Sequence, residues 1–235
     1  MKDEGQQGGV AAGAVIFDVD GTLYWQKGLR RRMLVDLLSS ALFSSRTRLD
    51  LRILKRFRED RETLGERVDS GFAEAQYRLT AEALGLTPER VEDAVRRWIY
   101  ERPLRYLRKH RVPGIEVWLE KLRAAGVRSA VYSEYPAVEK LAALGLSFDA
   151  VVSSTDPDVD AFKPNPKGIQ VALEKLGVPA ERALFVGDRQ DRDGACAAAA
   201  GLDFLWVDRS SAEGLSSFPP PRQSLPDYLK ETGVA

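Results

Sequence analysis

The sequence predicts an α/β fold in which a doubly wound parallel sheet is joined to a small all-helical domain. Residues 14–18 form a short apolar run that ends in a glycine turn, which is typical of a buried strand. Apolar residues then recur at helical spacing over residues 27–104. From Ile115 onwards helical and strand patterns alternate, and repeated strand–helix units build a parallel sheet.

The first strand is expected over residues 14–18, and it runs into the sequence DVDGT at residues 18–22. Roughly four helices are expected over residues 27–104, with a break at Gly65 and at residues 68–71. The pair Thr87-Pro88 has the residue types of a helix N-cap and first helical position. This stretch is therefore predicted to be all-helical.

Alternating helices and strands are expected in the second half of the chain. Ligands of doubly wound sheets bind beyond the carboxyl ends of the strands, so the residues that follow each strand matter most. A tail rich in Ser and Pro, residues 210–223, predicts a surface excursion before a last short helix at residues 225–231. Helices are expected over residues 115–125, 136–144, 166–176 and 191–200, and strands over residues 128–133, 150–153, 183–186 and 204–207.

The composition limits the possible functions. The chain has 235 residues, and its 35 basic residues balance 35 acidic ones, which indicates neither a nucleic-acid binder nor a polybasic membrane protein. One cysteine, Cys196, forms no internal disulfide, and neither a long apolar span nor a signal peptide is recognised, so a cytoplasmic protein is expected. One histidine, His110, excludes His-rich zinc sites. Any catalysis is therefore expected to use carboxylates.

Two carboxylates, Asp18 and Asp20, stand two residues apart where the first strand turns into a loop. Asp18 suits a nucleophile, because an ionised carboxylate needs no base and forms an acyl phosphate that divides one slow displacement into two steps. Asp20 suits a general acid and base that protonates the leaving alkoxide and later deprotonates water. That role requires a pKa raised by its surroundings.

Four more polar residues follow predicted strands. Ser133 can donate a hydrogen bond to a phosphoryl oxygen, and Lys163 can neutralise charge on the nucleophile and the phosphoryl group. Asp188 and Asp193 add carboxylates opposite Asp18, which gives the oxygen-rich shell that Mg²⁺ prefers. The expected cofactor is therefore Mg²⁺.

These residues, in this order, resemble the four motifs of the haloacid-dehalogenase-like (HAD) hydrolase superfamily: DxDGT, a strand-end Ser or Thr, a Lys, and an acidic GDxxxxD. The resemblance covers residues 14–23 and 113–208, and the helical stretch between the first two motifs is similar to the small helical cap of the superfamily's first subclass. It implies a Rossmann-like catalytic core over residues 1–25 and 108–235 and a helical cap domain over residues 26–107.

The resemblance also implies a role for each matching residue. Asp18 matches the nucleophile, which also ligates the metal, and Asp20 matches the general acid and base, whose backbone carbonyl is a further metal ligand. The other matches are the phosphate binders Ser133 and Lys163, the metal ligand Asp188, and Asp193, which would act through a metal-bound water.

Two positions depart from the family's pattern. Glu134 follows Ser133 where many relatives have Asn, and its negative charge near an anionic substrate suggests that it points away or contacts a positive group of substrate or cap. Asp191 is an extra acid inside the fourth motif and is interpreted as a solvated helix-start residue, a reading that also stays open for Asp193.

The roles of several other residues can be interpreted from their positions in the sequence. Tyr24 and Trp25, just after the catalytic turn, either line the pocket or pack the hinge. Arg30 either meets an anionic group of the substrate or belongs to a solvated helix face. His110 is assigned to a surface or hinge, and Cys196 to buried packing.

The predicted activity is hydrolysis of a phosphomonoester, a small phosphorylated metabolite, through an aspartyl phosphate. A phosphomutase of the same superfamily and a non-catalytic HAD-like binding protein are the alternatives. Carbon–halogen cleavage is disfavoured, since the enzymes that perform it lack the second carboxylate that Asp20 provides. Neither nucleic acid nor membrane is an expected partner, and a monomer or a homodimer is expected.

Overall fold

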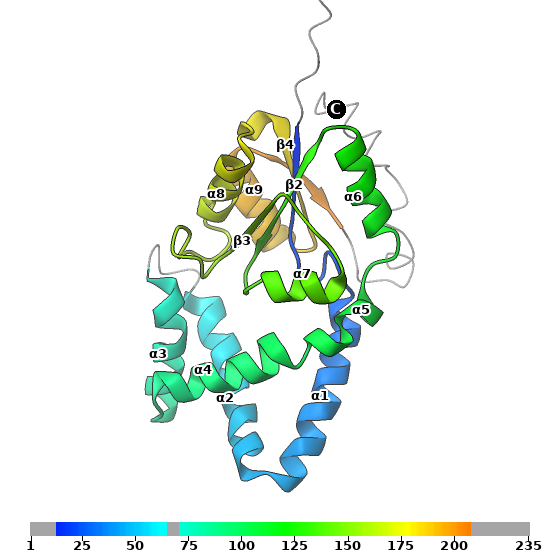
Figure 1. Ribbon diagram of the computed structural model, residues 1–235. Coiled ribbons are helices and arrows are strands. Elements are labelled where there is room, and N and C mark those ends of the chain that lie inside the picture. Colours follow the sequence, from blue (N-terminus) through cyan, green and yellow to red (C-terminus); the bar gives the residue numbers. More distant parts are fainter. Residues whose placement is uncertain (1–12, 65–70, 208–235) are drawn as a thin grey trace, which may run out of the picture.

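The computed structural model describes residues 13–64 and 71–207 of the chain, and its centre is a five-stranded parallel sheet with strand order β3-β2-β1-β4-β5 (Figure 1). The α/β class and the parallel sheet predicted from the sequence are confirmed. The strands are β1 (Ala14–Phe17), β2 (Arg128–Ser133), β3 (Ala150–Ser153), β4 (Ala183–Gly187) and β5 (Asp203–Trp206).

Strand β1 lies in the middle of the sheet, and all four of its residues are apolar, which suits a strand that is fully buried on both faces. It pairs with β2 on one side and with β4 on the other. The chain builds outward through β2 and β3 and then crosses to β4 and β5. The carboxyl end of β1 is therefore the topological switch point, the place where doubly wound sheets bind ligands.

Helices cover both faces of the sheet (Figure 1). Side chains alternate along β1, so Val15 and Phe17 belong to one core cluster and Ala14 and Ile16 to the other. The first cluster includes residues of α6 (Ile115–Ala124) and α7 (Val138–Leu144), and the second includes residues of α8 (Lys167–Leu176) and α9 (Ala195–Ala200).

A helical insert, residues 26–110, lies beyond the carboxyl ends of the strands (Figure 1). It has a core of its own, which includes Ile53, Phe57 and Trp98. Fully buried Asp50 links its helices by accepting from Arg90 at 2.5 Å, from Arg97 at 3.0 Å and from the Trp98 indole at 2.9 Å. The insert comprises α1 (Gln26–Phe43), α2 (Ser45–Leu64), α3 (Phe72–Leu84), α4 (Pro88–Val95), a π-helix (Arg96–Glu101) and α5 (Leu104–His110).

Two chain segments that lie side by side join the insert to the sheet. The Trp25 N–H donates to the His110 carbonyl at 2.7 Å, and the Val112 N–H donates to the Leu23 carbonyl at 3.0 Å. The rings of Trp25 and His110 also pack edge to face, with their centroids 6.3 Å apart. The entry and exit of the insert are thus held together.

The predicted elements agree with the structure to within a few residues. Thr87 is the N-cap of α4, and its side chain accepts from the Arg90 N–H. The expected helix at residues 191–200 is divided into a π-helical turn (Gln190–Gly194) and α9, because the Asp193 and Gly194 N–H groups both return to the Arg189 carbonyl.

The break expected within residues 65–71 falls almost entirely outside the described residues, as do the tail at 210–223 and the last helix at 225–231. Among residues 13–64 and 71–207, no helix combines the length and the apolar character needed to cross a membrane.

Candidate active site

Asp18 lies one residue beyond β1, at the switch point of the sheet. Its N–H donates to the Val186 carbonyl at 2.8 Å, so the backbone is fixed by the neighbouring strand. One carboxylate oxygen accepts from the Lys163 ammonium at 2.7 Å, and the other accepts from the Thr22 hydroxyl at 3.0 Å. The buried carboxylate is therefore held in one orientation.

Lys163 is fully buried and bridges two carboxylates, with its Nζ 2.7 Å from Asp18 Oδ1 and 2.8 Å from Asp193 Oδ1. Burial opposes the charged form of this lysine, but the two carboxylates outweigh burial and raise its pKa well above the usual range. Lys163 is thus a fixed positive charge beside Asp18.

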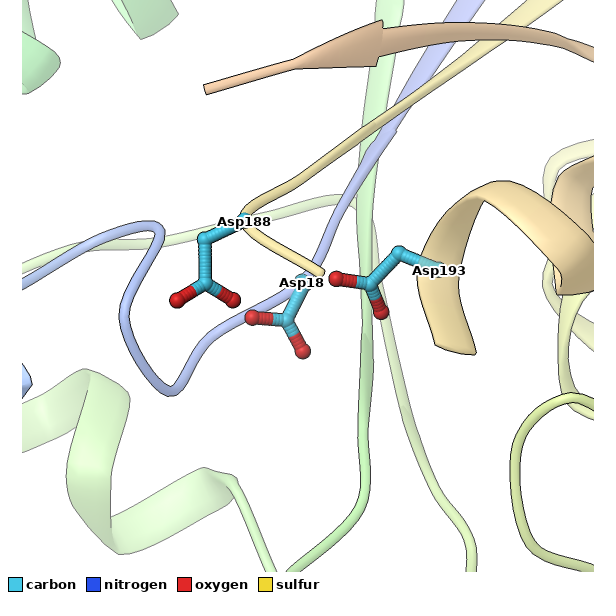
Figure 2. Close-up of side chains that lie close together, drawn as sticks. All are labelled: Asp18, Asp188 and Asp193. Atoms are coloured by element: carbon cyan, nitrogen blue, oxygen red, sulfur yellow. The ribbon is translucent and has the colours of Figure 1, made fainter. Parts of the chain in front are cut away.

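Asp18, Asp188 and Asp193 form a cluster in which one carboxylate oxygen from each lies within 4.8 Å of the others (Figure 2). Burial and then Asp193 raise the pKa of Asp188 to about 7. Gly21, with φ of +109°, makes room for the cluster, because a Cβ at this position would collide with the Asp188 carboxylate.

This donor set fits a hard divalent cation. Burial raises the pKa of Asp18 well above its ordinary value, and the neighbouring Asp193 and Asp188 carboxylates raise it further against the opposing Lys163. Negative groups that raise one another's pKa bind a compensating cation favourably, and oxygen ligands suit Mg²⁺.

Asp193 is 2% exposed, so it is not a solvated acid. Its Oδ1 accepts from Lys163, and its Oδ2 accepts from the Arg189 N–H at 3.0 Å. In contrast, the Asp191 side chain is 68% exposed and pairs with the Arg189 guanidinium at 2.9 Å. The open reading of a solvated acid therefore describes Asp191 and not Asp193.

The Asp20 side chain is not part of the carboxylate cluster. Both of its oxygens accept from the Lys140 ammonium at 2.7 Å, the Tyr24 hydroxyl donates to it, and the Ser133 hydroxyl lies 3.5 Å away. Burial alone would raise the pKa of Asp20, but Lys140 and Tyr24 outweigh burial, and the pKa is lowered. The sequence led us to expect a raised pKa for Asp20, and the surroundings of this carboxyl lower it instead.

Lys140 contacts Asp20 and was not predicted from the sequence. It lies on α7 rather than at a strand end, and it is 4% exposed. One signal was present in the sequence, because Lys140 shares a helix face with Leu144, which packs against the sheet. A lysine on a core-facing helix stripe needs a carboxylate partner, and the partner here is Asp20.

A family model of haloacid dehalogenase-like hydrolases matches residues 12–201. This chain belongs to that family. The resemblance noted in the sequence is thereby confirmed.

Three relatives of this HAD hydrolase are phosphatases by name. It is 29% identical to glyceraldehyde 3-phosphate phosphatase of Methanopyrus kandleri over 221 residues, which are 92% of this chain and 91% of the relative. It is 31% identical to phosphoserine phosphatase of Thermus thermophilus over 141 residues, 59% of this chain and 55% of the relative. The crystal structure of a HAD phosphatase from Thermococcus onnurineus aligns with a TM-score of 0.58 at 27% identity, covering 94% of this chain and 98% of that one. The predictions of an enzyme and of a phosphatase are confirmed by these relatives.

Ser133 and Glu134 of this HAD hydrolase follow β2. Ser133 is fully buried, and its Oγ accepts from the Tyr135 N–H at 3.2 Å. Burial raises the pKa of the Glu134 carboxyl, with Lys163 and then Arg61 opposing the shift. The Glu134 carbonyl accepts from Arg61 of α2, so this residue contacts the helical insert through its backbone.

Tyr24 and Trp25 of the HAD hydrolase differ in their exposure and in their contacts. Tyr24 is 3% exposed, donates to Asp20 and borders a pocket, whereas Trp25 is 40% exposed and packs against His110 where the insert joins the sheet. Cys196 is buried and donates to the Asn165 carbonyl at 3.2 Å, and burial raises the pKa of its thiol to about 12.

Two adjoining pockets lie between the insert and the sheet of the HAD hydrolase. The polar pocket, about 230 Å³, contains the carboxylate cluster together with Glu134 and Arg189. The apolar pocket, about 130 Å³, is bordered by side chains of α1, α2, the π-helix and α5. Five residues border both pockets: Asp20, Gln26, Arg30, Arg58 and Tyr135.

Proposed function

We propose that this chain is a Mg²⁺-dependent phosphomonoester hydrolase that acts on a small phosphorylated metabolite through an aspartyl phosphate at Asp18. The observation that carries the proposal is the arrangement at the switch point, where buried Asp18 is oriented by Lys163 and faces Asp188 and Asp193. An ionised nucleophile, a fixed ammonium and a divalent-cation site together are what phosphoryl transfer requires.

The reaction has two steps in this proposal. The phosphoryl group lies in the polar pocket, where Ser133 and Lys163 donate hydrogen bonds to its oxygens. Asp18 attacks phosphorus, the bond from phosphorus to the leaving oxygen breaks, and Asp20 gives that oxygen a proton. Asp20 then takes a proton from water, which attacks the phosphorus and releases phosphate and free Asp18.

The cation's ligands in this proposal are Asp18, Asp188, the backbone carbonyl of Asp20 and, through water, Asp193. When bound, Mg²⁺ neutralises negative charge on the phosphoryl oxygens and on the carboxylate cluster. The raised pKa values of Asp18 and Asp188 support this assignment, because a cation would return both carboxyls to their ionised forms.

Lys140 keeps Asp20 ionised before substrate binds, because it lowers the pKa of that carboxyl. The acid role requires a proton on Asp20. An arriving phosphate brings negative charge beside Asp20, and like charge raises a carboxyl pKa. In this proposal, binding of the substrate therefore loads Asp20 with the proton that the leaving group receives.

The helical insert serves as a cap domain over residues 26–107 in this proposal, and residues 1–25 and 108–235 form the core. The position of both pockets between insert and sheet supports that division. Closing a cap over the phosphoryl group excludes bulk water and strengthens the electrostatic interactions of the site.

The test is release of inorganic phosphate from an aryl phosphate and from a panel of sugar, amino-acid and organic-acid phosphates, with Mg²⁺ and with chelator. The wild type is expected to release phosphate only with Mg²⁺, and Asp18→Asn, checked for its fold by circular dichroism, is expected to release none. Conversion of a sugar phosphate into its isomer without release would favour a phosphomutase. A folded wild type that processes no compound would favour a binding role.

A further inference from the structure

Two of the four arginines that border the pockets have protein partners. Arg61 donates to Gln76 at 3.1 Å and to the Glu134 carbonyl, and it stacks on the Tyr135 ring at 3.8 Å. Arg189 pairs with Asp191 at 2.9 Å and with Glu62 at 3.3 Å. The side chains of these two arginines are therefore occupied in holding the insert and the loop after β4.

Arg30 and Arg58 differ from these arginines. Within residues 13–64 and 71–207, neither guanidinium has a hydrogen bond or an ion pair with another residue. Both are exposed, and both border the polar pocket and the apolar pocket. They come from consecutive helices, since Arg30 lies in α1 and Arg58 in α2.

The positive charge of Arg30 acts on Arg58, which borders the same two pockets. Desolvation is the main cause that lowers the pKa of Arg58, and the positive charge of Arg30 lowers it further, against an opposing effect of Tyr135. Guanidinium groups that have no ion pair with another described residue favour binding of an anion, because planar guanidinium donors match carboxylate and phosphate oxygens.

The phosphoryl group that is transferred already has its own donors. Ser133 ends β2, the Lys163 ammonium contacts Asp18, and the carboxylate cluster supplies a cation site. Arg30 and Arg58 instead stand where the polar pocket opens into the apolar pocket. That position is on the leaving-group side of Asp20, the residue that protonates the leaving oxygen.

The apolar pocket indicates the body of the leaving group. Its volume of about 130 Å³ is close to that of a cavity that binds benzene, about 150 Å³. A group of the size of one six-membered ring therefore fits. The apolar side chains that border it include Leu29, Met33, Leu37, Leu54, Trp98 and Leu107.

We propose that the substrate's leaving group combines a second anionic group, bound by Arg30 and Arg58, with an apolar portion of about one ring, held in the apolar pocket. The proposal rests on the proposed function, because it names the substrate class of the same site. It predicts that the enzyme prefers phosphomonoesters with a charged apolar leaving group over neutral ones of the same shape.

Matched aryl phosphates test this preference. The probes are 3-carboxyphenyl phosphate and its neutral isostere 3-carbamoylphenyl phosphate, with 1,3-phenylene bisphosphate to tell a carboxylate from a second phosphate. The ratio of kcat/KM for the charged and the neutral probe is measured for the wild type, Arg30→Gln and Arg58→Gln. Arg31→Gln and Arg52→Gln, exposed neighbours on the same two helices that border neither pocket, are the controls.

The wild type is expected to favour a charged probe. Each of Arg30→Gln and Arg58→Gln is expected to lower that preference by about tenfold, the size of one charge-assisted hydrogen bond, while both controls keep it. The anionic probe with the larger ratio identifies the second group as carboxylate or phosphate. Equal losses on charged and neutral probes would assign the arginines to the transferred phosphoryl group and overturn the proposal, as would a wild type without preference.

Calorimetric binding of the probes to Asp18→Asn separates this inference from the proposed function. Tighter binding of a charged probe, lost when Arg58→Gln is added, would support the subsite even if the wild type released no phosphate. Equal affinity for the charged and neutral probes would contradict the subsite even if the wild type proved to be a phosphatase.

Discussion

The core edge and the pocket face of the helical insert differ in how their charged side chains are paired. At the core edge, Lys163 bridges Asp18 and Asp193, and Lys140 pairs with Asp20, so each ammonium has carboxylate partners within 2.8 Å. On the insert, Arg30 and Arg58 reach the pockets without partners among the described residues. The difference supports the proposed division of labour, in which the core supplies the catalytic groups and the insert supplies unpaired positive charge that a substrate would neutralise.

Lys163→Met should produce the largest effect, because it removes the ammonium that two buried carboxylates share. Loss of one fixed electrostatic donor lowers kcat by about 10²- to 10³-fold. Leaving buried charge without a partner costs about 3–5 kcal/mol of unfolding free energy. Phosphate release and denaturant unfolding measure the two effects.

The control is Lys175→Met, which removes a half-exposed ion pair with Asp158. It should change the unfolding free energy by less than about 1 kcal/mol. A Lys163→Met protein as active as the control would show that the core edge does not depend on its internal pairing.

Asp50→Ala tests whether the insert has a core of its own. The substitution leaves Arg90 and Arg97 without the buried carboxylate between them, and it should cost about 3–5 kcal/mol of unfolding free energy. Asp93→Ala, which breaks partly exposed ion pairs on the same helices, should cost less than about 1 kcal/mol for each pair. Thermal unfolding compares them, and equal losses would mean that Asp50 is no more important than a surface acid.

Lys140→Met tests whether Lys140 controls the pKa of Asp20. Lys140 lowers the pKa of this carboxyl, so its removal should raise that pKa. In the proposed mechanism Asp20 acts as an acid only while protonated, and a higher pKa keeps it protonated to higher pH. The alkaline limb of the kcat profile should therefore move to higher pH, and an unmoved limb would remove Lys140 from the control of Asp20.

Glu134→Gln should have the smallest effect. It keeps the shape of the side chain and removes a negative charge from the border of the polar pocket, so KM for an anionic substrate should fall a few-fold. Glu139→Gln, at an exposed position of α7, should leave KM unchanged. A loss of kcat in Glu134→Gln would instead show that its charge has a use in the reaction.

The sequence could predict the residues at the strand ends because an apolar strand can be recognised from the pattern of residues along the chain. Asp18 and Asp188 come directly after apolar strands and Ser133 ends one, and a parallel sheet brings such ends to one edge, whereas Lys163 lies in the loop between β3 and α8. The rule for strand ends does not predict which side chains in the middle of a helix reach the site. Lys140 reaches Asp20 from α7, so the sign of the Asp20 pKa shift could not be predicted from the first motif alone.

The position of Arg58 at the pockets could not be predicted from the sequence for a related reason. Helix α2 carries many charged side chains, and nothing in its order of residues distinguishes Arg58 from Arg52, which borders neither pocket. The distinction depends on how α2 is rotated against α1 and on which carboxylates are near. Packing between helices, rather than the pattern along one helix, selects the residues that face the pocket.

The most direct test of the central claim is detection of phosphate bound covalently to Asp18 during turnover. The enzyme is mixed with substrate and Mg²⁺, quenched in acid within the first turnovers, digested, and its peptides are examined by mass spectrometry. The account predicts phosphate on the peptide that contains Asp18, at the Asp18 side chain, and none in Asp18→Asn. Rapid phosphate release with no phosphorylated Asp18, or undiminished release by Asp18→Asn, would contradict it.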